Sequence, residues 1–587
     1  MTKERDRTAQ AHGADINRRN FLFKAPVAAV GIGALVSMNA LEAASVATGQ
    51  KPAGTGSANY SGAGVPRLIV QDGAAEVDTA YGRVRGFIRN DIRTFRGVPY
   101  GGDTSGPNRF MPPTKPTPWK GARSSLYWGQ GSPQVVPKRD NDEVTFFANP
   151  PAAEYGENCL CLNVWTPGLD NAKRPVMVWM HGGGFSFGIP QLCFYDGENL
   201  SHRGDVVVVS IHHRLNVVGF LNLASYSSKY ADSANVGMMD LVAALKWVHE
   251  NIAGFGGDPD KVMILGQSGG GGKVMTTLAM PAAKGFVHRA AIQSMASSGG
   301  RAMMDALLKG RSDPAEGVAY GFTRPEQSAD VAARLLTELN IIPSHVDDLQ
   351  KVPIDRLVEA GGKIRGSWGP TVDGRSLPNT PFYPTAPEIS ADVPLLVGNV
   401  LNENVYSVGH PELENMTETE AKALLTKTLG DGDTIYEAFL KAYPGSRPYD
   451  VYSVAMATPG RQGSLILAER KTAQGRAPAY NYLFTWKSKI LNGRPRSFHM
   501  VELPFVFYTT DLSEARIGAT DEARELAGRV CDCWVAFART GNPNHPGIPH
   551  WPAYDPRTVP TMIFDNVCTV KNDPSGEARG TIKPSTT

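Results

Sequence analysis

The sequence of 587 residues has no strong excess of either charge, because 59 basic side chains are balanced by 57 acidic ones. A net charge of +2 gives no reason to expect nucleic acid or an acidic surface as the partner. The sequence also lacks a heptad pattern, a repeat period and a zinc-type cluster of cysteine and histidine. We therefore expect neither a coiled coil nor a solenoid, and neither a metal nor an organic cofactor.

An apolar run long enough to span a membrane is missing at the N-terminus. The stretch Ala25–Met38 falls short of the roughly 20 residues that a bilayer requires. It follows the pair Arg18 and Arg19 in "NRRNFLFK" and precedes the small residues of "NALEAASVA". This order is typical of an export signal, and the paired arginines indicate the twin-arginine type. We predict that residues 1–47 direct the protein to the bacterial periplasm or the medium; a membrane anchor is the alternative.

Residues 48–75 are predicted to be a flexible linker, since Thr48–Gly64 is rich in glycine, serine and alanine. No similar stretch interrupts the chain from Glu76 to about Pro574. We therefore predict one large catalytic domain over residues 76–575, followed by a C-terminal tail over residues 576–587.

Cysteine is scarce, and two pairs of cysteines are separated by a single residue. Side chains so close in sequence point apart on a strand or a helix and pair badly. Cargo of the twin-arginine route is usually folded before export, in a reducing compartment. We expect mostly free, buried thiols that act as small apolar groups. The six are Cys159, Cys161, Cys193, Cys531, Cys533 and Cys568.

Apolar runs that are typical of buried strands alternate with helical stretches. Continuous Val, Ile and Leu runs between helices indicate a parallel sheet covered on both faces. The chain is therefore predicted to be an α/β protein, with a large, mostly parallel central sheet flanked by helices and interrupted by insertions. The predicted strands are Val176–Met180, the run from Val206, Lys261–Gln267, Val393–Asn399 and Pro478–Trp486.

One strand leads into "GQSGGGGK", in which Ser268 is followed by four glycines and a helical stretch. The pattern G-x-S-x-G between a strand and a helix is typical of a nucleophile elbow. Glycine suits this tight turn because it has no side chain to clash. The helix that follows directs the positive end of its dipole toward the serine oxygen. Ser268 is therefore the candidate nucleophile; a glycine-rich turn with an incidental serine is the alternative.

A second glycine-rich stretch, "MHGGGFSFG", follows an earlier strand. Loops of the HGGG type supply backbone N–H groups to an oxyanion hole. We assign the donors to Gly183, Gly184 and Gly269, and we expect His181 to hold the loop by hydrogen bonds.

Many ordered blocks of the chain resemble the type-B carboxylesterase family, which includes cholinesterases and bacterial para-nitrobenzyl esterases. They include "GVPYGGDTSGPNRFMPP", "ENCLCLNVWTP" and "LKWVHENIAGFGGDPDKVMILGQSGGG", and the resemblance extends from about Tyr81 to Asp565. It implies the α/β-hydrolase fold, with insertions over an active-site gorge. It also implies a serine esterase that needs no cofactor.

The family order of Ser, Glu and His selects two further residues. "VPLLVGNVLNENVYS" matches the block that carries the glutamate, which is Glu403, and "RSFHMVELPFVF" matches the H-x-x-E-L-P block, which gives His499. From the residues alone, His410 is a rival base, and Asp373 and Asp392 are rival acids. Both selected residues follow apolar strands, where loops gather at the carboxyl end of a parallel sheet.

The predicted reaction is hydrolysis of neutral, hydrophobic carboxylic esters through an acyl-enzyme. His499 would take the proton of Ser268, and Glu403 would orient the imidazole. Aromatic residues near Tyr406 and Phe498 are expected to line the gorge. Carbamates, thioesters and lactones would suit the same machinery. The alternative to an enzyme is a non-catalytic binding protein with the same fold, as in the family's adhesion proteins.

The chain departs from the family pattern around the serine. The pattern has glutamate before the serine and alanine after it, whereas this chain has Gln267 and Gly269. Gly270 is expected to let the helix pack closely on its strand. Gly271 and Gly272 exceed what the motif requires, so we hypothesise that they open space for bulky esters; close helix packing is the alternative.

Two further departures concern lysine and cysteine. We expect Lys273 to be a surface or ion-paired residue that turns away from the serine. The family cysteine that would pair with Cys159 is replaced by Ser132. The histidines of "HHR", His212 and His213, are expected to be structural.

Overall fold

The structure, a computed structural model, describes residues 67–136, 141–148, 152–295, 322–364 and 368–583. The predicted export signal and residues 48–66 of the predicted linker lie outside these ranges.

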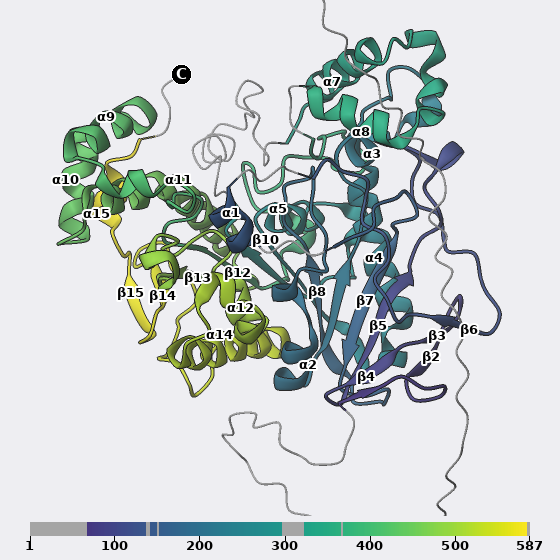
Figure 1. Cartoon of the computed structure of the whole chain (residues 1–587), viewed down its shortest axis with the longest axis horizontal. Helices are drawn as coiled ribbons and strands as arrows, with labels where there is room; N and C mark the ends of the chain where they lie inside the picture. The colour runs from purple at the N-terminus through teal and green to yellow at the C-terminus, as the bar shows by residue number, and fades with distance from the viewer. Residues whose placement is uncertain (1–66, 137–140, 149–151, 296–321, 365–367, 584–587) are drawn as a thin grey trace, which may run out of the picture. The chain divides into compact units, whose positions relative to one another are not determined.

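A twelve-stranded sheet runs through the described part of the chain (Figure 1). Neighbouring strands from β9 to β14 are all parallel, and the antiparallel pairs lie toward the two edges. The predicted strands are present as β9, β8, β10, β12 and β13, so the prediction of a mostly parallel sheet is confirmed. In spatial order the strands are β1 (Leu68–Ile69), β4 (Phe87–Arg89), β5 (Ile92–Pro99), β7 (Cys161–Thr166), β9 (Val207–Ile211), β8 (Arg174–Met180), β10 (Gly257–Gln267), β11 (Arg289–Gln293), β12 (Leu395–Val400), β13 (Ala479–Phe484), β14 (Pro560–Phe564) and β15 (Thr569–Asn572).

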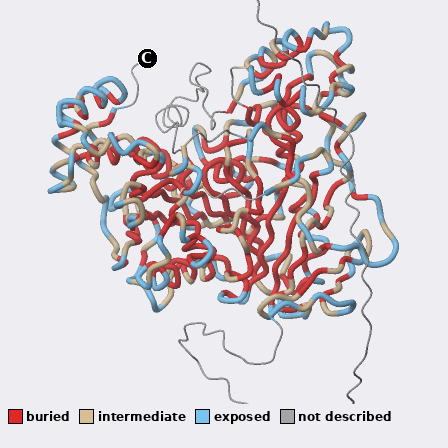
Figure 2. Tube along the Cα trace, viewed as in Figure 1, coloured by how far each residue is buried: buried red, intermediate tan, exposed pale blue. Residues whose placement is uncertain are grey.

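Helices cover both faces of this sheet because its strands are apolar on both sides. Along β8, Val176 and Val178 belong to one buried cluster, whereas Met177 and Trp179 belong to another. Figure 2 shows the buried chain running through the sheet between its helical layers. The first face packs against α4 (Val236–Asn251), α5 (Gly269–Thr277) and α11 (Pro448–Ala473). The second packs against α2 (Glu198–Gly204), α12 (Leu503–Val506) and α14 (Asp521–Thr540).

Long insertions separate the later strands, as expected. The segment between β11 and β12 carries α7 (Pro325–Glu338) and α8 (Ile354–Lys363). The segment between β12 and β13 carries α9 (Glu418–Leu429) and α10 (Gly432–Ala442), which form a third apolar cluster with α11.

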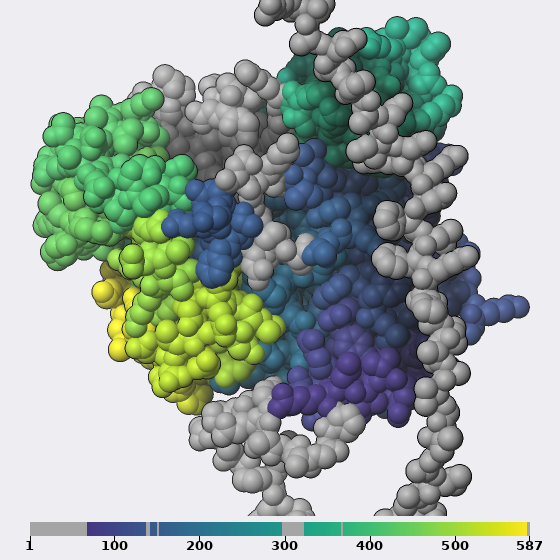
Figure 3. Space-filling model, viewed as in Figure 1, coloured from purple at the N-terminus to yellow at the C-terminus, as the bar shows by residue number. Residues whose placement is uncertain are grey.

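Segments far apart in the sequence meet beside this helical insertion. Helix α1 (Asp142–Ala148) contacts α13 (Glu514–Ile517). In Figure 3 the dark blue of the chain around α1 lies against the yellow-green of its later part. Arg494 forms an ion pair with Glu143 of α1, and Gly409 N–H donates to the same carboxylate at 2.8 Å. The N-terminal and C-terminal parts of the chain are thus joined on this face.

A second, smaller sheet and a short helix are also present. The second sheet contains β2 (Glu76–Thr79), β3 (Gly82–Arg85) and β6 (Ala122–Ser124). Helix α3 (Asn216–Phe220) packs against α4 and α8.

The structure has regular elements inside the predicted linker and the predicted tail. Strand β1 lies inside the predicted linker and pairs antiparallel with β4. Residues 576–580 of the predicted tail form helix α15 (Gly576–Gly580), and Ala578 and Ile582 pack into the third apolar cluster. Contacts with distant parts of the chain define both segments. Each is too short to show a periodic pattern, so the sequence alone did not predict them.

All six cysteines are free thiols, as predicted. Cys159 is buried, and Ser132 instead uses its hydroxyl to accept a hydrogen bond from Leu215 N–H at 3.1 Å. Within the ranges described, no helix combines the length and the apolar character needed to cross a bilayer.

Candidate active site

Ser268 lies in a tight turn between β10 and α5. Its backbone has φ +59° and ψ −126°, a region that is strained for a residue with a side chain. The turn is held by a hydrogen bond of 2.9 Å from Ser268 N–H to Gln293 O of β11. A Cβ at Gly270 would lie 2.0 Å from Met180 O, so glycine is required for α5 to pack on β8. The predicted strand, turn and helix are confirmed, and so is the packing role of Gly270.

The glycine loop lies directly against the start of α5. Gly183 and Gly184 have φ of +93° and +63°, in the left-handed region that favours glycine. A Cβ at Gly269 would lie 2.3–2.4 Å from backbone atoms of Gly184. No acceptor is recorded for the N–H groups of Gly183, Gly184 and Gly269 among the described residues. The structure therefore brings the three predicted donors together.

His181, at the start of this loop, is buried and forms a hydrogen bond within the loop. Its Nδ1 lies 2.8 Å from Gly182 O, which makes Nδ1 the donor in that pair. Its ring stacks against that of His213 with centroids 4.8 Å apart. Burial, reinforced by the charge of Lys273, lowers the pKa of His181 well below its ordinary value. The expected structural role of His181 agrees with these contacts.

Glu403 and His499 come together beyond the ends of β12 and β13. The carboxylate is fully buried, and its Oε2 lies 2.6 Å from His499 Nδ1. The second oxygen, Oε1, accepts from Asn399 Nδ2 at 3.0 Å and from Val400 N–H at 3.3 Å. His499 N–H also donates to Glu403 O at 2.9 Å, which fixes the two backbones relative to each other.

Gln267 links the imidazole to the serine turn. Its Nε2 donates to His499 O at 2.5 Å and lies 3.2–3.3 Å from the two ring nitrogens. Gln267 directly precedes Ser268, so His499 lies beside the turn that carries the serine. The family pattern has a glutamate here, and the amide leaves this contact without a negative charge.

A second carboxyl group, Glu502, lies close to Glu403 and was not selected from the sequence. Its Oε1 accepts a hydrogen bond from Gln293 Nε2 at 3.1 Å, and its side chain is fully buried. Burial, and then the charge of Glu403, raises the pKa of Glu502 well above its ordinary value. Glu502 therefore holds its proton more tightly than an exposed carboxyl group does. Glu502 is the glutamate of the H-x-x-E-L-P block. The sequence analysis used this block only to select His499 and assigned no role to the glutamate.

The rival residues lie elsewhere. His410 is exposed and pairs with Glu412, and Asp392 is exposed and pairs with Arg476. Asp373 accepts hydrogen bonds from Ser376 Oγ at 2.6 Å and Asn235 Nδ2 at 3.1 Å, in a separate turn.

The last two glycines of the elbow and the aromatic residue beside His499 were each assigned a role near the substrate from the sequence. A Cβ at Gly271 would meet Met295 and the β11 backbone at 3.2–3.3 Å, so glycine there allows close helix packing. A Cβ at Gly272 would touch the Phe185 ring at 3.4 Å, which is ordinary contact, so packing does not require glycine at that position. The hypothesis that the two glycines open space for bulky esters stays a prediction. Phe498 is buried and packs on the Phe147 ring at 4.8 Å, so it belongs to the apolar core.

Lys273 was predicted to be a surface or ion-paired residue. This prediction is wrong, because its side chain is completely buried. Residues four apart share one face of a helix, so Lys273 lies on the face of Gly269, which is pressed against the glycine loop. The spacing of four residues between Gly269 and Lys273 could have predicted this burial from the sequence.

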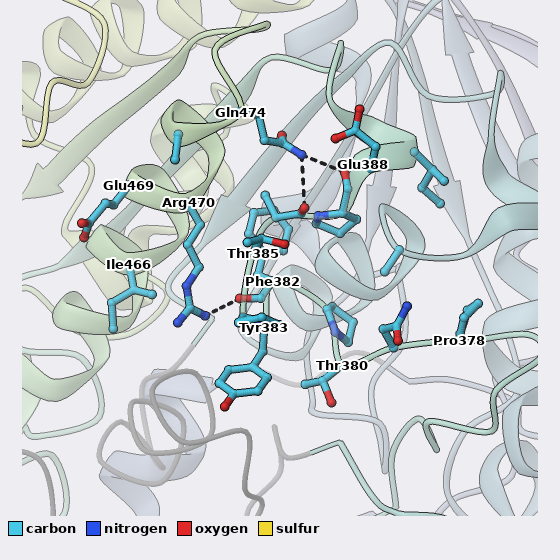
Figure 4. A pocket seen from close by; sticks show the side chains of 18 of the residues that line it. Pro378, Thr380, Phe382, Tyr383, Thr385, Glu388, Ile466, Glu469, Arg470 and Gln474 are labelled. Atoms are coloured by element: carbon cyan, nitrogen blue, oxygen red, sulfur yellow. Dashed lines mark hydrogen bonds between the residues drawn. The ribbon is translucent and has the colours of Figure 1, made fainter.

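A cavity of about 940 Å³ lies beyond the far end of α5. Figure 4 shows its lining, in which Arg470 donates to Phe382 O and Gln474 Nε2 donates to Ala386 O and Pro387 O. None of the predicted site residues lines it. Geometry around the serine, rather than cavity size, therefore locates the candidate site. Groups of three or more metal-ligating side chains do not occur among the described residues.

The parallel sheet, with a strained serine between a strand and a helix, defines an α/β-hydrolase fold. Solved structures agree with this assignment. A carboxylesterase from Geobacillus stearothermophilus is 32% identical with a TM-score of 0.71, over 87% of this chain and 100% of that one. An esterase from Clostridium hathewayi that can hydrolyze aliphatic aromatic polyesters is 32% identical with a TM-score of 0.72, over 87% of this chain and 98% of that one.

Residues 73–578 match the carboxylesterase family, and the chain belongs to that family. It is similar to the para-nitrobenzyl esterase of Bacillus subtilis, with 32% identity over 87% of this chain and 98% of the relative. It is also similar to the phenmedipham hydrolase of Pseudarthrobacter oxydans, with 28% identity over 81% and 92%. The chain is thus a carboxylic-ester hydrolase of the type-B group.

Proposed function

We propose that the protein is a serine carboxylesterase in which Ser268 is the nucleophile, His499 the general base and Glu403 the residue that orients the imidazole. The observation that carries this proposal is the contact of 2.6 Å between His499 Nδ1 and Glu403 Oε2 beside the strained serine turn. An ionised carboxylate on Nδ1 fixes the tautomer that leaves Nε2 free to accept a proton.

The reaction follows from these roles. His499 takes the proton of Ser268 as its oxygen attacks the ester carbonyl. The N–H groups of Gly183, Gly184 and Gly269 stabilise the alkoxide, each contributing a few kcal/mol. His499 then returns the proton to the leaving alcohol. Water, activated by the same imidazole, releases the acid from the acyl-enzyme.

The substrates are neutral, hydrophobic carboxylic esters. Gln267 carries no charge, so Glu403 is the carboxyl group that the imidazole contacts. The similarity to the para-nitrobenzyl esterase of Bacillus subtilis supports benzyl-type esters as the first class to test.

We also propose that the enzyme is exported, on the basis of Arg18 and Arg19 ahead of the apolar stretch Ala25–Met38. Replacement of both arginines by lysine should keep the full-length precursor inside the cells. Secretion of that variant at the wild-type level would contradict the proposal.

The test of the esterase compares wild-type protein with Ser268→Ala on para-nitrobenzyl acetate and on para-nitrophenyl esters of increasing acyl length. We expect turnover by the wild type and a loss of at least about 10⁴-fold in the variant. If both folded proteins leave every ester intact, the non-catalytic binding class would replace the esterase proposal.

A further inference from the structure

A buried lysine with no acidic partner lies directly behind the candidate oxyanion loop. Lys273 is the fifth residue of α5, and its side chain is 0% exposed. No ion pair to Lys273 is found in the part of the chain that the structure describes. Buried lysines are rare because the ammonium group loses its hydration. A side chain kept in such a position calls for a specific contact.

That contact is a hydrogen bond to the loop. Lys273 Nζ donates to His181 O at 2.8 Å and lies 5.8 Å from the centre of the Phe185 ring. The next residue, Gly182, packs on the serine turn, since a Cβ there would lie 3.0 Å from Gln267 O and 3.4 Å from Ser268 Cβ. The hydrogen bond therefore joins α5 to the first peptide of the loop that ends in Gly183 and Gly184.

The groups around the amine are bases. His181 comes from the loop after β8, and His213 stacks on it from the end of β9, next to His212. Burial lowers the pKa of Lys273 to about 7, and it lowers the pKa of His212 to about 3. A lysine side chain carries N–H donors in its charged form and in its neutral form. The loop is held by a hydrogen bond that does not depend on a full charge.

We propose that Lys273 is a positioning residue for ester hydrolysis: through His181 O it ties the glycine loop to the helix that begins at Ser268. The N–H groups of Gly183 and Gly184 then keep their register with the serine oxygen. A loop that drifts weakens the contacts made to the alkoxide more than those made to the bound ester. This inference rests on the proposed function.

The test uses Lys273→Met, which keeps the length and removes the donor, and Lys273→Gln, which restores a neutral donor. The control is Thr276→Val, because Thr276 is buried on the same helix and its hydroxyl donates at 2.8 Å only to Gly272 O within α5. Each variant is assayed for kcat and KM, and for inhibition by a trifluoromethyl ketone, whose adduct places an oxyanion in the hole.

We expect Lys273→Met to lower kcat about tenfold, less than the loss of one oxyanion donor, with KM within about threefold of wild type. The inhibition constant of the ketone should rise in parallel with the loss of kcat. Lys273→Gln should recover part of both, and Thr276→Val should match wild type.

Two outcomes would overturn the inference. One is a folded Lys273→Met enzyme with wild-type kcat and ketone affinity. The other is a folded Lys273→Gln enzyme as impaired as the methionine variant. If Ser268→Ala retains wild-type turnover, the proposed function fails instead, so the two failures are distinguishable.

Discussion

The close approach of Gly269 to the backbone of Gly184 leads to a sharp prediction for Gly269→Ala. The added methyl group would lie 2.3–2.4 Å from the N, Cα and O atoms of Gly184. Ordinary contact begins at 3.4 Å, so Gly184 must retreat by about 1 Å. Backbone atoms cannot swing aside as a flexible side chain would. The alanine of the family pattern therefore has no room here unless the loop moves.

The expected loss follows from that displacement. A shift of about 1 Å in a catalytic group lowers the rate by about 10²-fold, which equals about 2.7 kcal/mol of barrier. Gly269→Ala should therefore lower kcat about a hundredfold. KM should stay within about threefold, because the donors act mainly on the alkoxide.

The matched control lies three residues further along the helix. A methyl group at Gly272 would touch the Phe185 ring at 3.4 Å, which is ordinary contact. Gly272→Ala should keep wild-type kcat and stabilise α5 by up to about 1 kcal/mol. Steady-state kinetics and thermal unfolding of both variants decide the matter. A Gly269→Ala enzyme with wild-type kcat would refute the reasoning.

Three further predictions follow from the buried charges and thiols. Glu403→Gln should lower kcat about 10⁴-fold in steady-state assays while leaving the fold intact, because the amide no longer holds the imidazole in the required tautomer; a loss below about tenfold would count against the role of Glu403. In thermal unfolding, Glu502→Gln should become more stable relative to the wild type as the pH rises above 4.5. The pKa of Glu502 is raised in the folded wild type, so the folded protein holds a proton that the unfolded chain releases, and wild-type stability falls by up to about 1.4 kcal/mol per pH unit; a pH-independent difference would contradict this. A reducing agent should leave the melting temperature and the activity unchanged, because all six cysteines are free.

The sheet was predictable because its central strands carry continuous apolar runs. β8, β9, β10 and β12 are buried on both faces, and nothing local competes with the strand assignment. The serine turn was predictable for a related reason, since glycines at a strand end have few other uses. The partners of the serine required the family resemblance, because many residues separate them in sequence.

Other features could not be predicted because they depend on contacts distant in sequence. Strand β1 has two residues and is defined only by its pairing with β4. The pKa of Glu502 is raised by burial and by the charge of Glu403, and the sequence does not reveal either contact. Lys273 was expected at the surface because lysine usually lies there, but the packed glycines of α5 leave no path to solvent on its face.

The central claim, that Ser268 is the nucleophile, is tested most directly by covalent trapping. Purified enzyme is incubated with a dialkyl phosphoryl ester that phosphorylates active serines, and intact mass and peptide mass spectra are recorded. We predict one adduct per chain, on the peptide that carries Ser268, with a loss of esterase activity in proportion to its formation. Ser268→Ala should acquire none. Inactivation without an adduct on Ser268, or an equal adduct on the variant, would contradict the account.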